Sequence, residues 1–295
     1  MIPRVTITCI SVERVFDNLG NFNSNNHTLL ELCGREPLAD GDEYESIMRQ
    51  TAFHQWVHLT GLDFCQVKLF LDDCVLLIEA GTPGQLTNRV PNQYREELEE
   101  LGKRLDNEMK IIPCFARFSR CSLKDGKNGP GPFTNAMDML SNIVTSGRCY
   151  EELSRNVRLG TMPVMLYTLP WLKEMNVKNE FRVFVYDGQV TAISQYDAYV
   201  YAGWDMRQSE IMDLVIQVEK MVESYVNSNL KTTSFTMDIL FNNTSVTLVE
   251  LNSFGAQMAA GSALFHWIID YDLLHGKLDG IEVRVLSFMV FTDCK

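Results

Sequence analysis

The chain has 295 residues, a formal net charge of −12, 46% hydrophobic residues and 22% charged residues. This length and composition predict a globular protein of one or two closely packed domains. The acidic excess argues against nucleic acid as the main partner, because a phosphate backbone attracts a basic surface. No apolar run approaches the roughly 18 residues of a membrane-spanning helix, and the eight cysteines include no Cys-x-x-Cys pair. We therefore expect no signal peptide, no membrane contact, and reduced thiols in a cytoplasmic protein.

The first half of the chain predicts short strands and helices separated by polar loops. Residues 1–50 begin like a strand but are rich in polar and acidic residues, which predicts an extension rather than a domain. Pro91 opens a clear helix, in which apolar residues recur at helical spacing from Tyr94 to Leu105. A flexible loop rich in glycine and proline follows at 124–132. The patterns also predict a helix within 46–60 and strands at 64–70, 74–79 and 111–119.

The second half contains the clearest hairpin signal, in which residues 180–186 and 189–195 flank the turn dipeptide Asp187-Gly188. An amphipathic helix is predicted at 207–227. The order of elements indicates an α+β fold with antiparallel hairpins, not regularly alternating βαβ units. Neither the Gly-x4-Gly-Lys-Ser/Thr phosphate motif nor a Rossmann glycine pattern is present. Further predicted elements are helices near 137–140, 150–153 and 262–274 and strands at 164–168 and 281–291.

A second predicted hairpin, 235–241 and 246–255, carries a pair of carboxylates. If its loop centres near Thr244, Asp238 lies opposite Glu250, and Asn252 shares a strand face with Glu250. Two carboxylates that face each other across a ladder repel, so the arrangement favours a cation between them. Two carboxylates and an amide suit Mg²⁺. The alternative is that these are ordinary polar residues on the wet face of a ribbon.

Cationic residues accompany the strands and the glycine-rich loop. Arg117 lies in the strand before that loop, and Lys124 and Lys127 lie within it. Glu180 and Arg182 alternate on one face of another strand. Cations together with a carboxylate and amide metal site are what a nucleotide triphosphate requires. The alternative for Glu180 and Arg182 is a surface ion pair of little energetic value.

Several stretches, in the same order, resemble the cell division cycle protein 123 family, an atypical group of ATP-grasp proteins. An Asp-bearing strand followed by Glu-x-Asn also resembles the metal site of ATP-grasp proteins in general. The resemblance covers roughly residues 50–275. The matching stretches are 53–56, 112–125, 180–185, 192–197 and 237–239 with 248–254.

This resemblance implies an α+β ATP-grasp fold, with two lobes whose antiparallel sheets clamp a nucleotide. Residues 1–50 would form an N-terminal extension, residues 51–168 the N-terminal or lid lobe, and residues 169–295 the C-terminal lobe with the metal site. The implied cofactors are ATP and Mg²⁺. The lid over the phosphates would include the loop at 124–132.

The resemblance also implies roles for particular residues. The metal ligands would be Asp238, Glu250 and Asn252. If the protein is an enzyme, Arg182 and Lys124 would be the catalytic residues. The cofactor-binding set would consist of the metal ligands together with Arg117, Lys124, Asp125, Tyr167, Thr168, Leu169, Glu180 and Arg182.

The chain departs from the family pattern on the cationic side of this site. Arg117 stands where the family has a lysine, and Tyr196 stands where it has an arginine. Arginine keeps the charge but presents a different geometry, whereas tyrosine removes one phosphate clamp. These departures predict a divergent member with a complete metal set beside an incomplete cation set.

Two functions follow as hypotheses. The resemblance implies an ATP–Mg-binding assembly chaperone for a protein partner, the gamma subunit of eukaryotic translation initiation factor 2. The alternative is an ATP-grasp ligase of the carboxylate–amine type, which forms an acyl phosphate and uses cations to stabilise the transferred phosphoryl group. A third reading is that no nucleotide binds.

Overall fold

The structure is a computed structural model that describes residues 4–17, 22, 28–35, 39–228, 230–258 and 260–288. The chain divides into two compact units, a larger one made of Met1–Thr60 and Glu174–Lys295 and a smaller one made of Gly61–Lys173. The sequence predicts domain boundaries at 50/51 and at 168/169. The unit boundaries fall later, and the N-terminal residues join the C-terminal part because their first strand completes its sheet.

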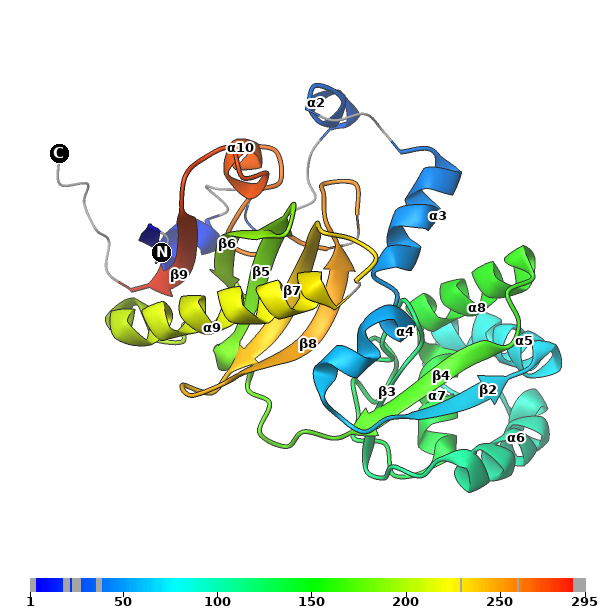
Figure 1. Ribbon diagram of the computed structural model, residues 1–295. Helices are drawn as coiled ribbons and strands as arrows, with labels where there is room; N and C mark the ends of the chain where they lie inside the picture. Colours follow the sequence, from blue (N-terminus) through cyan, green and yellow to red (C-terminus); the bar gives the residue numbers. More distant parts are fainter. Residues whose placement is uncertain are drawn as a thin grey trace. The chain divides into compact units, whose positions relative to one another are not determined.

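The larger unit is built on a six-stranded sheet (Figure 1). Its β9 is parallel to both neighbours, and the other neighbouring pairs are antiparallel. Both predicted hairpins are confirmed. In the first, Asp187 and Gly188 have φ of 47° and 75°, the positive pair that a tight hairpin turn favours. In order across the sheet the strands are β1 (Val5–Ser11), β9 (Ile281–Ser287), β6 (Gln189–Gln195), β5 (Glu180–Tyr186), β7 (Phe235–Phe241) and β8 (Val246–Ser253).

The two faces of this sheet are covered differently. Helix α9 (Gln208–Asn227) crosses one face with the buried stripe that its sequence predicts, including Leu214 and Val218 (Figure 1). On β5 the adjacent residues Val183 and Phe184 are both buried, and Phe184 packs edge-on against Phe265. Because neighbouring residues of a strand point to opposite faces, the segment around Phe265 covers the face opposite the one that Val183 occupies.

That covering segment corrects one prediction, since the helix expected at 262–274 is wrong. Only α10 (Tyr271–Leu274) is helical, and residues 261–270 run in turns. Ala263 has a φ of 51°, which a right-handed helix does not allow. The apolar residues here pack individually into the core, with Trp267 also donating from its indole to the Ala260 carbonyl at 2.9 Å.

The smaller unit packs helices against an antiparallel three-stranded sheet (Figure 1). The helix predicted after Pro91 is confirmed as α6 (Arg95–Glu108), and Leu98, Leu101 and Leu105 are buried. The sheet order is β2 (Cys65–Leu69), β4 (Val164–Pro170) and β3 (Cys114–Arg117). The other helices are α5 (Leu71–Thr87), α7 (Ala136–Thr145) and α8 (Gly147–Leu159).

The strand predicted at 74–79 is also wrong, because these residues lie inside α5. The apolar run has no clear period, so its pattern alone does not separate a strand from a buried helix. Asp73 accepts a hydrogen bond from the Phe70 amide at 2.7 Å and so caps the start of the helix.

The remaining elements lie close to their predicted positions. The helical region at 46–60 contains a break, and the strand predicted at 281–291 is described to Ser287, with 289–291 outside the described residues. In the part of the chain that the structure describes, no helix has both the length and the apolarity to cross a membrane. The helices of the N-terminal region are α1 (Val12–Phe16), α2 (Leu29–Cys33), α3 (Gly41–Gln50) and α4 (Phe53–Trp56).

Candidate functional site

A row of polar residues crosses the larger sheet on one face. Strand register aligns one residue from each of the six strands, and each is opposite the next. Asp238 is the register partner of Glu250, as the sequence predicted, and it is also the partner of Arg182. A β-bulge follows Asp238 on this ladder. In order the row is Thr8, Arg284, Ser194, Arg182, Asp238 and Glu250.

Arg182 and Asp238 form a buried, two-pronged ion pair. The Nε and Nη2 atoms of Arg182 donate to the two carboxylate oxygens of Asp238, each at 2.8 Å. The side chains are only 8% and 1% exposed. The remaining nitrogen, Nη1, donates to the Gly261 carbonyl at 2.6 Å. Arg182 therefore connects Asp238, one of the predicted metal ligands, to the segment that covers this face of the sheet.

Tyr196 lies against the same guanidinium. The ring centroid of Tyr196 is 5.0 Å from Cζ of Arg182, within the range of a cation–π contact. Burial and then the Asp238 carboxylate raise the pKa of Tyr196 to about 12, against the opposing effect of Arg182. Burial alone would lower the pKa of Arg182, but the charge and hydrogen bonds of Asp238 outweigh it and raise that pKa. At neutral pH the site thus contains a charged ion pair and a neutral phenol.

The three predicted metal ligands come together on β7 and β8. Glu250 faces Asp238, and the Asn252 amide nitrogen lies 3.5 Å from Oδ2 of Asp238. Asp238 is buried, whereas Glu250 and Asn252 are partly exposed. The Glu250 charge also contributes to the raised pKa of Arg182, which indicates that its carboxylate acts on the same cluster.

These donors fit a hard cation such as Mg²⁺. Asp238 is buried and accepts two hydrogen bonds from Arg182, whereas Glu250 and Asn252 are partly exposed. Glu250 and the carbonyl oxygen of Asn252 are therefore the more accessible ligands. Among the described residues, no cluster of three or more His, Cys, Asp or Glu side chains is arranged to hold a metal, and this set contains only two carboxylates.

The other predicted site residues lie in the smaller unit or at the start of β5. Arg117 is buried and donates from Nε to the Phe118 carbonyl at 3.3 Å. Lys124 is exposed. Asp125 caps α8 by accepting from the Ser146 hydroxyl at 2.6 Å and the Arg148 amide at 3.1 Å. Asp125 therefore has a structural task whether or not it contacts a ligand.

Tyr167, Thr168 and Leu169 are consecutive residues of β4, and all are buried. The Thr168 hydroxyl has no hydrogen-bond partner in the part of the chain described. Glu180 is the first residue of β5, and its carbonyl accepts from the Tyr196 amide at 2.9 Å. The structure thus brings Arg182, Asp238 and the metal-side residues together within the larger unit, and the roles of all of them stay predictions.

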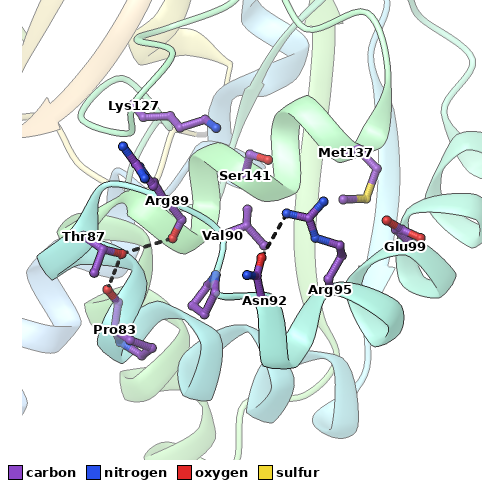
Figure 2. A pocket seen from close by; sticks show the side chains of 11 residues that line it. Pro83, Thr87, Arg89, Val90, Asn92, Arg95, Glu99, Lys127, Met137 and Ser141 are labelled. Atoms are coloured by element: carbon purple, nitrogen blue, oxygen red, sulfur yellow. Dashed lines mark hydrogen bonds between the residues drawn. The ribbon is translucent and has the colours of Figure 1, made fainter.

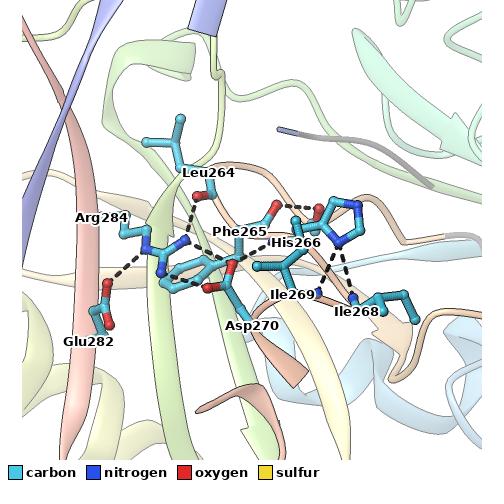
Figure 3. A network of polar contacts seen from close by, with 9 residues as sticks. Leu264, Phe265, His266, Ile268, Ile269, Asp270, Glu282 and Arg284 are labelled. Atoms are coloured by element: carbon cyan, nitrogen blue, oxygen red, sulfur yellow. Dashed lines mark hydrogen bonds and ion pairs between the residues drawn. The ribbon is translucent and has the colours of Figure 1, made fainter. Parts of the chain in front are cut away.

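Sequence reasoning missed a second arginine network on the same sheet face (Figure 3). Arg284 donates to both carboxylate oxygens of Asp270, each at 2.8 Å, and to Glu282 at 2.7 Å. It also donates to the Leu264 carbonyl at 3.2 Å, and the ring of Phe265 lies 4.1 Å from its Cζ. No sequence motif marks this network, because its members come together only when the segment 261–270 folds back over the sheet.

Comparison with known proteins connects this geometry to a family. The family model D123 matches residues 145–287, which include the hairpin with Asp238 and Glu250. The putative CDC123-like protein L884 of Acanthamoeba polyphaga mimivirus is 27% identical over 190 residues, which cover 60% of this chain and 57% of that protein. The translation initiation factor eIF2 assembly protein of Candida albicans is 29% identical over 97 residues, or 32% of this chain and 28% of that protein. The chain thus spans little more than half of the first relative and less of the second.

The fold is also that of a solved structure. C-terminally truncated Cdc123 from Schizosaccharomyces pombe superimposes with a TM-score of 0.61 at 16% identity, covering 82% of this chain and 98% of that one. This match confirms the predicted α+β fold. The chain is thus similar to the cell division cycle protein 123 family over the sheet that carries the site, and the family model covers just under half of the chain.

Proposed function

We propose that this protein is an ATP–Mg²⁺-binding assembly chaperone for eukaryotic translation initiation factor 2, acting on its gamma subunit in the cytoplasm. Similarity to the D123 family model and to the Candida albicans protein, an eIF2 assembly protein by name, supports the assembly role. One structural observation carries the nucleotide part, namely that Asp238 and Glu250 face each other across β7 and β8 with Asn252 beside them. Arg182 already pairs with Asp238, so the three charged side chains together carry −1, and Mg²⁺ bound at Glu250 would offset that remaining negative charge.

In this proposal Glu250 and Asn252 hold Mg²⁺ directly, and the Asp238 carboxylate lies beside them. The ion, when bound, neutralises phosphate charge. Arg182 holds Asp238 in one orientation and ties it to the Gly261 carbonyl, so the metal-side carboxylate is fixed before a ligand arrives. The roles predicted for Lys124 and the other cationic and hinge residues of the smaller unit stay predictions.

The contacts of Arg182 favour binding over catalysis. A ligase would use this arginine to stabilise charge on a transferred phosphoryl group. All three of its guanidinium nitrogens already donate hydrogen bonds to Asp238 or Gly261. Release of ADP that depends on an added carboxylate substrate would restore the ligase alternative, and its absence across a broad panel of carboxylates is expected.

Thermal unfolding tests the nucleotide part. ATP with Mg²⁺ at about a hundred times Kd should stabilise the protein by about 2.7 kcal/mol, and ATP alone should stabilise it less. Glu250→Gln should abolish the difference that Mg²⁺ makes. Glu223→Gln, an exposed residue of α9 in the same unit, is the matched control and should behave as the native chain. No stabilisation of the native chain by ATP–Mg²⁺ would remove this part of the proposal.

A binding assay with the purified gamma subunit tests the partner. The immobilised chain should retain the gamma subunit in ATP–Mg²⁺, and Glu250→Gln should retain less of it. Equal retention by both variants would separate partner binding from the nucleotide. No retention by the native chain would refute the assignment of this partner.

A further inference from the structure

The smaller unit contains a cavity of about 870 Å³ that plays no part in the proposed function (Figure 2). The cavity lies between the end of α5, the start of α6, the loop at 124–132 and the first helix after it. Its volume is in the range of pockets that hold drug-sized ligands. The residues that matter for its chemistry are Arg89, Val90, Arg95, Lys127, Met137 and Ser141.

The charge of this cavity is opposite to that of the chain. Three cationic residues line it, and Glu99 is its single acidic residue, whereas the whole chain carries −12. Arg89 and Lys127 are exposed, and within the described ranges no hydrogen bond or ion pair engages the guanidinium of Arg89 or the ammonium of Lys127. Like charges gathered without partners favour the binding of an anion.

The backbone that presents Lys127 is held tightly. The Lys127 amide donates to the Thr145 hydroxyl at 3.0 Å, and the adjacent Asn128 amide donates to the Asn142 side chain at 2.7 Å. Asn142 is fully buried and also donates to the carbonyl of Gly129 at 2.8 Å. At Gly126 a Cβ would lie 2.4 Å from the Asn142 carbonyl oxygen, so only glycine allows this close approach.

The two arginines are also positioned by local structure. Asn88 ends α5 in the left-handed conformation, with a φ of 52°, and Arg89 follows directly. The Thr87 hydroxyl donates to the Pro83 carbonyl at 2.8 Å and lies 3.5 Å from the Arg89 carbonyl. Arg95 donates from Nη2 to the Asn92 side chain at 3.1 Å. A site whose backbone is already ordered loses less entropy when a ligand binds.

We propose that this cavity binds a small organic phosphate. Figure 2 shows Arg89 and Lys127 gathered at one end, with Arg95 across Ser141 and Val90 from them. Arginine matches the geometry of phosphate oxygens with paired donors, and lysine adds a point charge. The phosphate group lies at the Arg89 and Lys127 end, the Ser141 hydroxyl is a further donor, and Val90 and Met137 contact the organic part.

Isothermal titration of the full chain with phenyl phosphate, without Mg²⁺ or ATP, tests this proposal. Saturable binding with a Kd near or below about 1 mM is expected, and inorganic phosphate should bind more weakly because it lacks an apolar part. Arg89→Ala and Lys127→Ala should each weaken binding by about tenfold, as expected for loss of a charge-assisted hydrogen bond. These side chains are exposed, so both variants should keep the native melting temperature.

Two control variants distinguish binding in this cavity from general charge attraction and from binding at the carboxylate pair. Lys103→Ala removes an exposed cation of α6 in the same unit and should leave binding unchanged, so equal weakening would indicate general charge attraction and refute the site. Glu250→Gln should also leave phenyl phosphate binding unchanged, which keeps this proposal separate from the proposed function. Binding of a phosphoserine peptide without binding of phenyl phosphate would replace the small ligand with a peptide. No binding of either probe would refute the proposal.

Discussion

Two arginines on one face of the larger sheet, the buried Arg182 and the partly exposed Arg284, have closely similar surroundings. Each donates two parallel hydrogen bonds to an aspartate, Asp238 for the first and Asp270 for the second. Each also donates to a backbone carbonyl of the segment that covers the sheet, and each has an aromatic ring against its guanidinium. The two networks differ in the position of their second carboxylate.

In the Arg284 network the second carboxylate is bonded to the same guanidinium, since Nε of Arg284 donates to Glu282. In the Arg182 network Nε of Arg182 donates to Asp238 instead, and Glu250 lies opposite Asp238 on the next strand. In the first arrangement both carboxylates bond to the one guanidinium, and its bonds to Asp270 and the Leu264 carbonyl hold residues 261–270 in place. The second leaves two carboxylates facing each other at a partly exposed edge of the cluster, which is the arrangement that a bound cation would stabilise.

The largest effect should come from Arg284→Met. This change leaves Asp270 and Glu282 without their cation and releases the segment they hold, so the free energy of unfolding should fall by about 3–5 kcal/mol. Urea denaturation measures it. Arg158→Met, at an exposed position of α8, should change stability by no more than about 0.5 kcal/mol. Equal losses in both variants would contradict a structural role for the Arg284 network.

Asp238→Asn should cost less, about 2–3 kcal/mol, because asparagine keeps one acceptor oxygen for Arg182 but loses the charge. Unlike Arg284→Met, it should also abolish the extra thermal stabilisation that Mg²⁺ gives to ATP. A variant that loses stability but keeps the full Mg²⁺ effect would show that Asp238 serves only the ion pair.

The sequence predicts that Asp238 faces Glu250, but the structure reaches this pairing by a different route. A four-residue loop, Asn242 to Ser245, pairs Phe241 with Val246, so a regular ladder would place Asp238 opposite Val249. The β-bulge between Asp238 and Ile239 shifts the register by one residue and brings Glu250 opposite Asp238. Side-chain periodicity predicts the α9 stripe, and turn composition predicts the Asp187-Gly188 turn.

The sequence does not predict what covers the sheet. The segment 261–270 is held by contacts with residues distant in the chain, such as the Leu264 amide donating to the Ser194 hydroxyl at 3.0 Å. Its apolar residues therefore resembled a helix in the sequence pattern alone. Tyr196 illustrates the same limit, because the sequence marks it as a lost phosphate clamp, whereas the structure shows it packed against Arg182.

Glu250→Gln should change stability in the opposite direction from Asp238→Asn. Removing one of two opposed carboxylates relieves repulsion across the ladder, so the ligand-free protein should gain about 0.2–1 kcal/mol. The same variant should lose the Mg²⁺-dependent stabilisation by ATP. Destabilisation of the ligand-free chain would indicate that Glu250 is needed for the fold. The Arg182 network would then have a structural role, like the Arg284 network.

At neutral pH the smallest effect should come from Tyr196→Phe, and its consequence for stability should appear only at alkaline pH. Burial and Asp238 raise the pKa of the folded Tyr196 from 10.0 to about 12. Between these values the unfolded chain releases the phenol proton while the folded chain keeps it, so stability falls as pH rises from about 10 to about 12. Phenylalanine keeps the ring against Arg182 but has no proton to lose, so its unfolding free energy should fall less steeply over this range. Tyr199→Phe, at an exposed position, should keep the native slope. If Tyr196→Phe and Tyr199→Phe both keep the native dependence of unfolding free energy on pH, the pKa of Tyr196 is not raised in the folded protein. The contact between Tyr196 and Arg182 is then one of packing alone.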